Sequence, residues 1–148
     1  MYTHILATTD GSELALRGVA HAAALAAALD ARLTVLTVSE PWNTALADPT
    51  GFGAAGELVN EYRAGAREQA DACLAAAAAL AGRHGVTAQV LHVEDRAPAE
   101  AIIDTAREHG CDLVVMASHG RSGLGRLLLG SQTQAVVGRS SVPVLVVR

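Results

Sequence analysis

The chain contains no lysine, because all 11 of its basic residues are arginines. A Schiff-base lysine and the phosphate-binding lysine of a P-loop are therefore excluded. Aromatic residues make up only 3% of the 148 residues and hydrophobic residues 51%, so the core has to be built from alanine, valine, leucine and isoleucine. Aliphatic runs of this kind are typical of a parallel sheet that helices cover on both faces.

The chain also lacks an excess of positive charge, since its formal net charge is −4. This argues against a nucleic-acid or anionic-membrane surface. The two cysteines, Cys73 and Cys111, form no C-x-x-C pair, and we expect buried, unreactive thiols. The first residues lack the pattern of a signal peptide, and no apolar stretch is long enough to span a membrane. The expected location is therefore cytoplasmic.

Apolar runs alternate with helical patterns along the chain, separated by turn residues. Strands are predicted over His4–Thr8, Arg32–Ser39, Val86–Val93, Leu113–Ala117 and Pro143–Arg148. Helices are predicted over 14–29, 57–84, 99–109 and 131–139, with a long loop over 43–56. The alternation predicts one α/β domain over residues 1–148, with a doubly wound parallel sheet of five strands. In the strand order 3-2-1-4-5, a ligand would sit where the order reverses, between the first and fourth strands.

The segment after the fourth predicted strand, 118–131, is rich in glycine and would face the turn Thr8–Ser12 at that point. Its glycines leave backbone amides open to an anion. Gly130 and Ser131 precede the last helix, whose N-terminus offers free N–H groups. Ser131 is a candidate N-cap or phosphate donor, and Ser118 and Arg121 add donors. The loop is neither a P-loop nor a dinucleotide fingerprint. A phosphate-binding loop and a purely structural loop both fit the glycine content alone.

With these residues in view, the chain resembles the universal stress protein family over nearly its whole length. The nucleotide-binding branch of that family carries Gly-x2-Gly-x9-Gly-[Ser/Thr] after its fourth strand. Gly120 and Gly130 match the second and third glycines and Ser131 follows, while Ala117 stands at the first. The other matching stretches are 5–12, 34–38, 112–121 and 143–147.

The resemblance implies a flavodoxin-like domain with strand order 3-2-1-4-5, which binds ATP, or AMP or ADP, with Mg²⁺ held by the phosphates. It also implies a homodimer through the last strand, Pro143–Val147. Thr8, Thr9 and Asp10 would lie near adenine and ribose. The implied nucleotide-binding residues are Thr8, Thr9, Asp10, Val38, Met116, Ala117, Ser118, His119, Gly120, Arg121, Gly130, Ser131, Gln132 and Thr133. Within this set Val38 and Met116 would line the adenine pocket, and Gly120, Gly130, Ser131 and Thr133 would hold phosphates.

The leading functional prediction is an ATP-binding stress-response sensor or regulator with slow hydrolysis at most, because no water-activating base or cationic finger is evident. No catalytic residue and no metal-ligand cluster is assigned. A second hypothesis is an interaction dimer of the same fold with an empty site. Ala117 favours it, as does Gln132, which stands where the family usually has a small apolar residue. A third is a small α/β enzyme with His119 as acid–base catalyst and Asp10 as its partner.

Overall fold

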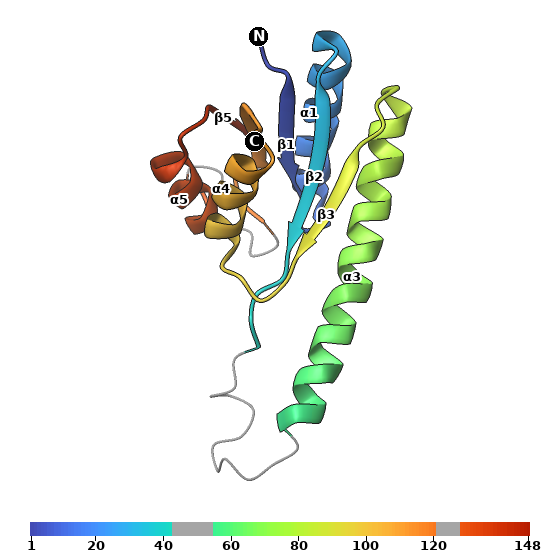
Figure 1. Ribbon diagram of the computed structural model, residues 1–148, viewed down its shortest axis with the longest axis vertical. Helices are drawn as coiled ribbons and strands as arrows, with labels where there is room; N and C mark the ends of the chain where they lie inside the picture. The colour runs from blue at the N-terminus through green and yellow to red at the C-terminus, as the bar shows by residue number, and fades with distance from the viewer. Residues whose placement is uncertain (43–54, 121–127) are drawn as a thin grey trace.

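The computed structural model of the chain describes residues 1–42, 55–120 and 128–148. Strands and helices alternate through these ranges (Figure 1). The strands are β1 (His4–Thr8), β2 (Arg32–Val38), β3 (Gln89–Val93), β4 (Leu113–Ala117) and β5 (Val144–Val147). The helices are α1 (Glu13–Leu29), α3 (Ala55–Arg83), α4 (Pro98–Glu108) and α5 (Ser131–Arg139).

The five strands form one parallel sheet in the order β3-β2-β1-β4-β5. The predicted α/β fold and strand order are thereby confirmed. Helices α1 and α3 pack on one face of the sheet, and α4 and α5 pack on the other (Figure 1). The order reverses between β1 and β4, so the loops after these two strands face each other at the carboxyl edge of the sheet.

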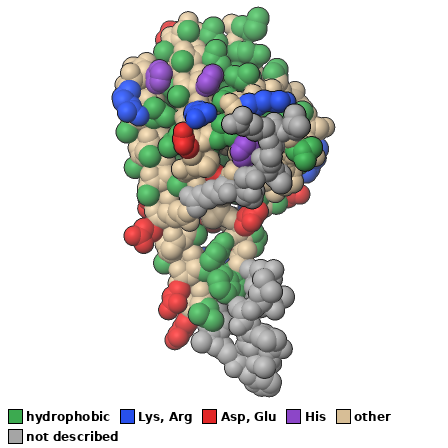
Figure 2. Space-filling model, turned by 180° about the vertical axis from the view of Figure 1, so that it is seen from behind, with side chains coloured by type: hydrophobic (Ala, Val, Ile, Leu, Met, Phe, Trp, Pro, Cys, Tyr) green, Lys and Arg blue, Asp and Glu red, His purple; other side chains and the backbone are tan. Residues whose placement is uncertain are grey.

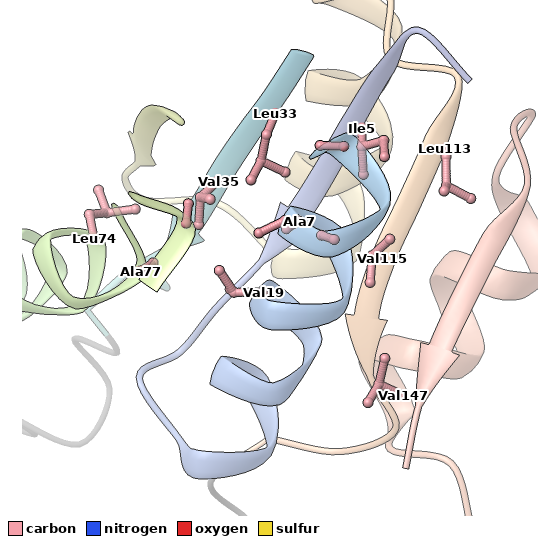
Figure 3. Close-up of a cluster of buried hydrophobic side chains, with 14 residues drawn as sticks. Ile5, Ala7, Val19, Leu33, Val35, Leu74, Ala77, Leu113, Val115 and Val147 are labelled. Carbon is pink, nitrogen blue, oxygen red and sulfur yellow. The ribbon is translucent and has the colours of Figure 1, made fainter. Parts of the chain in front are cut away.

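The core has two layers because the central strand is buried on both faces. Ile5 and Ala7 face α1 and α3, where they join a cluster that includes Val19 and Leu74 (Figure 3). Leu6 faces α4 and α5 and belongs to the second cluster. All three β1 side chains are fully buried. This two-sided burial explains why the strands read as continuous apolar runs rather than alternating ones.

The predicted bounds agree with the structure for β1, β4 and α5, and Ser12 is the N-cap of α1 as expected. The third strand is the largest difference, since β3 begins at Gln89 and not at Val86. Gly85 ends α3 with a φ of +75°, and the Val86 N–H returns to the Ala81 carbonyl at 3.1 Å. Val86 therefore belongs to the C-terminal cap of α3, where it packs against the core.

Both cysteines are buried and neither forms a disulfide, in agreement with the expectation of buried thiols. Burial raises the pKa of the Cys111 thiol to about 11, which keeps it protonated at neutral pH. On the face drawn in Figure 2, the arginine side chains lie in the upper, wider part, and the carboxylates extend into the narrow lower part of the described surface. Within the described ranges, none of the helices has the length and hydropathy needed to cross a bilayer.

His4 is a buried titratable group at the amino edge of the sheet, far along the strands from the switch point. Its Nδ1 lies 3.1 Å from the His109 carbonyl oxygen and its Nε2 lies 2.8 Å from Thr34 Oγ1. A neutral ring satisfies both contacts, with Nδ1–H donating and Nε2 accepting. Burial lowers the pKa of His4 below its ordinary value, and Arg32 adds to this, while Asp112 opposes it.

We expect His4 to make the folded state less stable in mild acid. Above pH 6.5, the ordinary value, the ring is neutral in the folded and unfolded chain alike. Below it the unfolded chain takes up the proton first, so stability falls with pH until the lower folded pKa is passed. Urea unfolding from about pH 7 to about pH 5 measures this decline. His4→Gln should flatten it, and His21→Gln, at an exposed histidine, should not. Equal slopes in all three proteins would contradict the assignment.

Candidate functional site

A cleft of about 830 Å³ opens at the carboxyl edge of the sheet, around the β1–β4 switch point. Its walls come from the ends of β1, β2 and β4 and from helices on both faces of the sheet. Most of the nucleotide-binding residues predicted from the sequence line this cleft. They are Thr8, Thr9, Asp10, Val38, Met116, Ala117, His119, Gly120, Gly130, Ser131, Gln132 and Thr133. Ser118 does not line it, and Arg121 lies outside the described residues.

The turn after β1 is built by side chains that accept backbone hydrogen bonds. Thr9 Oγ1 accepts from the Gly11 N–H at 3.1 Å, and Asp10 Oδ1 accepts from the Ser12 N–H at 2.9 Å. Ser12 Oγ then caps α1 by accepting from the Ala15 N–H at 3.2 Å. These local bonds hold the Asp10 carboxylate at the cleft, where Oδ1 forms the turn.

Asp10 and Gly120 meet across the switch point. A β-carbon added to Gly120 would lie 2.5 Å from Asp10 Oδ2, so a larger residue here would force the Asp10 carboxylate to shift. Two loops that are more than a hundred residues apart in sequence therefore share one surface. Asp10 and Gly120 both line the cleft.

The N-terminus of α5 presents free amides to the cleft. Gly130 is the N-cap, and the first backbone bond of the helix runs from the Gln134 N–H to the Gly130 carbonyl at 2.9 Å. The N–H groups of Ser131, Gln132 and Thr133 therefore have no acceptor within the helix. Ser131 is the first helical residue and not the N-cap. The Gly130 amide is committed, because it donates to the Ser118 carbonyl at 2.7 Å.

Two hydroxyl groups near these amides hold the framework together. Thr133 Oγ1 donates to the Ala117 carbonyl at 2.9 Å and is almost fully buried. Ser118 is buried, and its Oγ lies 3.1 Å from His119 Nδ1. Thr133 therefore offers a ligand its backbone N–H, and Ser118 acts by shaping the loop.

The side chain of Gln132 turns toward α4. Its Oε1 accepts from the Ala99 N–H at 3.0 Å. The N-cap of α4, Ala97, has no side-chain acceptor of its own, so Gln132 supplies the missing cap from another helix. Its length is thus used in a contact with α4.

The α4 side of the cleft is apolar, with Leu36, Val38, Pro98, Ile102 and Met116 in its lining. The backbone of Val38 adds polarity to this wall. Thr9 N–H donates to the Leu36 carbonyl and Ser39 N–H donates to the Val93 carbonyl. Since peptide groups alternate sides along a strand, those of Val38 point to the β1 side, beyond the last β1–β2 pair. A donor and an acceptor lie next to an apolar wall.

The α3 side of the cleft was missed by the sequence analysis. It includes Tyr62, whose hydroxyl donates to the Glu40 carbonyl at 2.9 Å. It also includes Ser39 and His92, whose Oγ and Nε2 lie 2.8 Å apart. These residues carry no motif in the sequence. For Ser39 and His92 the available signal is their position at the ends of β2 and β3, the edge where ligands bind in such sheets. Tyr62 lies on α3 and carries no such signal.

The charges of the described lining are acidic. Asp10, Glu40 and Glu61 contribute carboxylates, and no arginine is among the described lining residues. In the described part of the chain, no group of three or more His, Cys, Asp or Glu side chains is placed to hold a metal ion. An anionic ligand would therefore rest on neutral N–H donors, helix dipoles and its own counter-cation.

Comparison with known proteins gives one family. The model of the universal stress protein family matches residues 1–148. A universal stress protein of Thermus aquaticus, encoded 3′ of a sulfhydrylase, is 38% identical over 148 residues, covering 100% of both chains. The universal stress protein YxiE of Bacillus subtilis is 31% identical, again over the full length of both chains.

Solved structures agree with these relatives. The structure of protein MJ0577, a universal stress protein of Methanocaldococcus jannaschii, superposes with a TM-score of 0.83 at 29% identity and covers 99% of this chain and 96% of its own. A universal stress protein in complex with cAMP superposes with a TM-score of 0.70 at 28% identity, covering 99% and 97%. The flavodoxin-like fold is thereby confirmed.

Proposed function

The chain belongs to the universal stress protein family, and on that premise we propose that it is a cytoplasmic sensor or regulator that binds ATP with little or slow hydrolysis. The observation that carries the proposal is the convergence, in one cleft, of the free α5 amides and the Asp10–Gly120 contact. Backbone N–H groups at a helix N-terminus are suited to phosphate. The cAMP complex of a relative supports an adenine nucleotide as the ligand class.

The base would lie against the wall of Val38, Ile102 and Met116. The backbone groups of Val38 that point to the β1 side suit the edge of adenine. Its N–H would donate to N1, and its C=O would accept from the N6 amino group. The ribose would lie at Asp10, whose carboxylate accepts hydroxyl hydrogen bonds. The phosphates would then reach the amides of Ser131, Gln132 and Thr133. Adenine, ribose and phosphate each meet groups of fitting chemistry in this arrangement.

Magnesium would enter with the phosphates. Asp10 is the single carboxylate at the switch point, and one carboxylate with water and phosphate oxygens is how Mg²⁺ is usually held beside a nucleotide. When bound, the ion would screen the phosphates from the acidic lining. A single carboxylate fits an ion that the phosphates bring with them. It does not fit a metal site whose ligands all come from the protein.

Slow turnover follows from the same groups. His119 Nδ1 contacts a neutral Ser118 hydroxyl and not a carboxylate. No arginine of the described lining can stabilise charge on a transferring phosphoryl group. The other lining residues would bind and orient the nucleotide without activating water. This suits a regulator whose conformation depends on the bound nucleotide. This disfavours the His119 enzyme hypothesis.

We expect stripped protein to bind ATP with a dissociation constant in the micromolar range, about 8 kcal/mol of binding free energy. Adenosine should bind at least about tenfold more weakly, because it lacks the phosphates that meet the α5 amides. GTP should also bind more weakly, because its base presents a different edge to Val38. Calorimetric titration with each ligand, in magnesium, makes the measurement. No heat at millimolar ATP would contradict the proposal and favour the empty-site dimer.

The proposal includes a homodimer formed through β5. This strand is an edge of the sheet, and Leu145 is 37% exposed on it. An apolar edge strand invites pairing with a second copy. Val137 on α5, which covers the other face of the sheet from Leu145, is 47% exposed and would extend the contact on that face.

A further inference from the structure

Gln132 joins the starts of two helices that both border the cleft. It is the second residue of α5, and its side-chain oxygen accepts from Ala99, the second residue of α4. Pro98 and Ile102 bring α4 to the cleft, and Ser131 and Gln132 bring α5. The contact therefore links the apolar wall to the helix start that carries the free amides.

The need for this contact arises in α4 itself. Ala97 offers no side-chain acceptor, and Pro98 has no N–H to satisfy. The first orphan amide of the helix is then that of Ala99, a residue only 4% exposed. A buried amide without an acceptor is destabilising, so the Gln132 oxygen at 3.0 Å holds α4 against α5.

The same contact fixes which way the Gln132 amide is turned. Because the Ala99 N–H requires an acceptor, the oxygen faces α4 and both hydrogens on Nε2 stay available as donors. Gln132 lines the cleft, and the described lining contains no arginine. A neutral side-chain donor beside three backbone amides has more weight in such a site than it would beside a cation.

We propose that Gln132 is a positioning residue of the nucleotide site: its oxygen sets the distance between the base wall and the α5 amides, and its Nε2 group donates to the terminal phosphate. This inference rests on the proposed ATP function. It identifies a residue that favours ligands with more phosphates. It also gives Gln132 a part in binding, whereas the empty-site hypothesis takes this residue as a feature in its favour.

Two variants distinguish the positioning role of the Gln132 oxygen from the donor role of its Nε2 group. Gln132→Glu keeps an oxygen for Ala99 and places an acid in the first turn of α5, so thermal stability should stay close to that of the wild type. It removes the donor and adds negative charge, so ATP affinity should fall at least about tenfold while adenosine affinity changes little. Gln132→Met loses both groups at similar length. Its melting midpoint should drop by about 3 °C, and its affinity for adenosine should fall along with that for ATP.

The control is Gln134→Glu, which adds the same charge to the same helix at an exposed residue outside the cleft lining. It should bind ATP within about threefold of the wild type. Calorimetry with adenosine, AMP and ATP and a thermal melt of each protein complete the test. Wild-type affinity in Gln132→Glu, or a loss equal to that in Gln134→Glu, would overturn the donor role. An unchanged midpoint in Gln132→Met would overturn the positioning role. No ATP binding by the wild type would instead remove the proposed function, and this inference with it.

Discussion

Gly130→Val is expected to lower ATP affinity by at least about 100-fold and folding stability by about 1–3 kcal/mol. A β-carbon at Gly130 would lie 3.3 Å from His119 Cα and from the Ser118 carbonyl, and both of these are backbone atoms. The backbone angles of Gly130, φ −57° and ψ 154°, are allowed for valine, so the cost is steric. Relief of the clash would push the start of α5 away from the segment that carries Gly120.

The affinity would suffer more than the stability because three free amides follow Gly130 directly. A displacement of about 1 Å is enough to spoil several phosphate hydrogen bonds at once. Gly138→Val is the matched control, since it makes the same change in the same helix where a β-carbon meets open space. Calorimetry with ATP and urea unfolding measure both effects. Equal ATP affinity in the two variants would contradict a phosphate site at the N-terminus of α5.

Val146→Pro is expected to convert the proposed homodimer into a monomer with little change in the fold. The carbonyl oxygens of Pro143 and Val147 accept from β4, so the peptide groups of Val144 and Val146 point to the open edge. Proline at 146 removes one outward N–H and leaves the β4 ladder intact. In a symmetric dimer each protomer carries the substitution, so the interface loses the hydrogen bond at residue 146 twice. The expected effect is therefore large.

Sedimentation would follow the change, since the wild type should run at twice the 15.1 kDa chain mass and Val146→Pro at the chain mass. The control is Val90→Pro on β3, the other edge strand, where the N–H also points outward because Val93 faces β2. Its dimer should persist. A monomeric wild type, or a dimeric Val146→Pro protein, would contradict dimerisation through β5.

Much of the fold followed from local patterns. The apolar run of β1 and its Asp10–Ser12 turn marked a strand followed by a helix, and the structure has both at the predicted residues. The alternation of strands and helices then left a parallel sheet as the physical solution, because each apolar face needs a cover. The start of β3 was predicted too early. The apolar side chain of Val86 suggested a strand, but Val86 belongs to the C-terminal cap of α3 and packs against the core from there.

For the candidate site, the sequence predicted the position of most residues but not their individual contacts. The glycine spacing and the acidic turn placed most of the predicted residues around one cleft. Their individual roles depended on contacts that the sequence does not display. Ser118 is buried and does not line the cleft, and the Gly130 amide is already bonded. The α3 wall, with Tyr62 and His92, carries no sequence motif at all.

Local sequence patterns thus determined the alternation of strands and helices and the glycine-rich segment, since periodicity and turn chemistry are properties of neighbours along the chain. The strand order, and with it the edge at which a ligand would sit, was implied by the resemblance to the family and is confirmed by the structure. Only the tertiary structure decided that Gln132 caps α4 and that Asp10 lies against Gly120. Such contacts join residues more than thirty positions apart, and side-chain packing, not local preference, selects their partners.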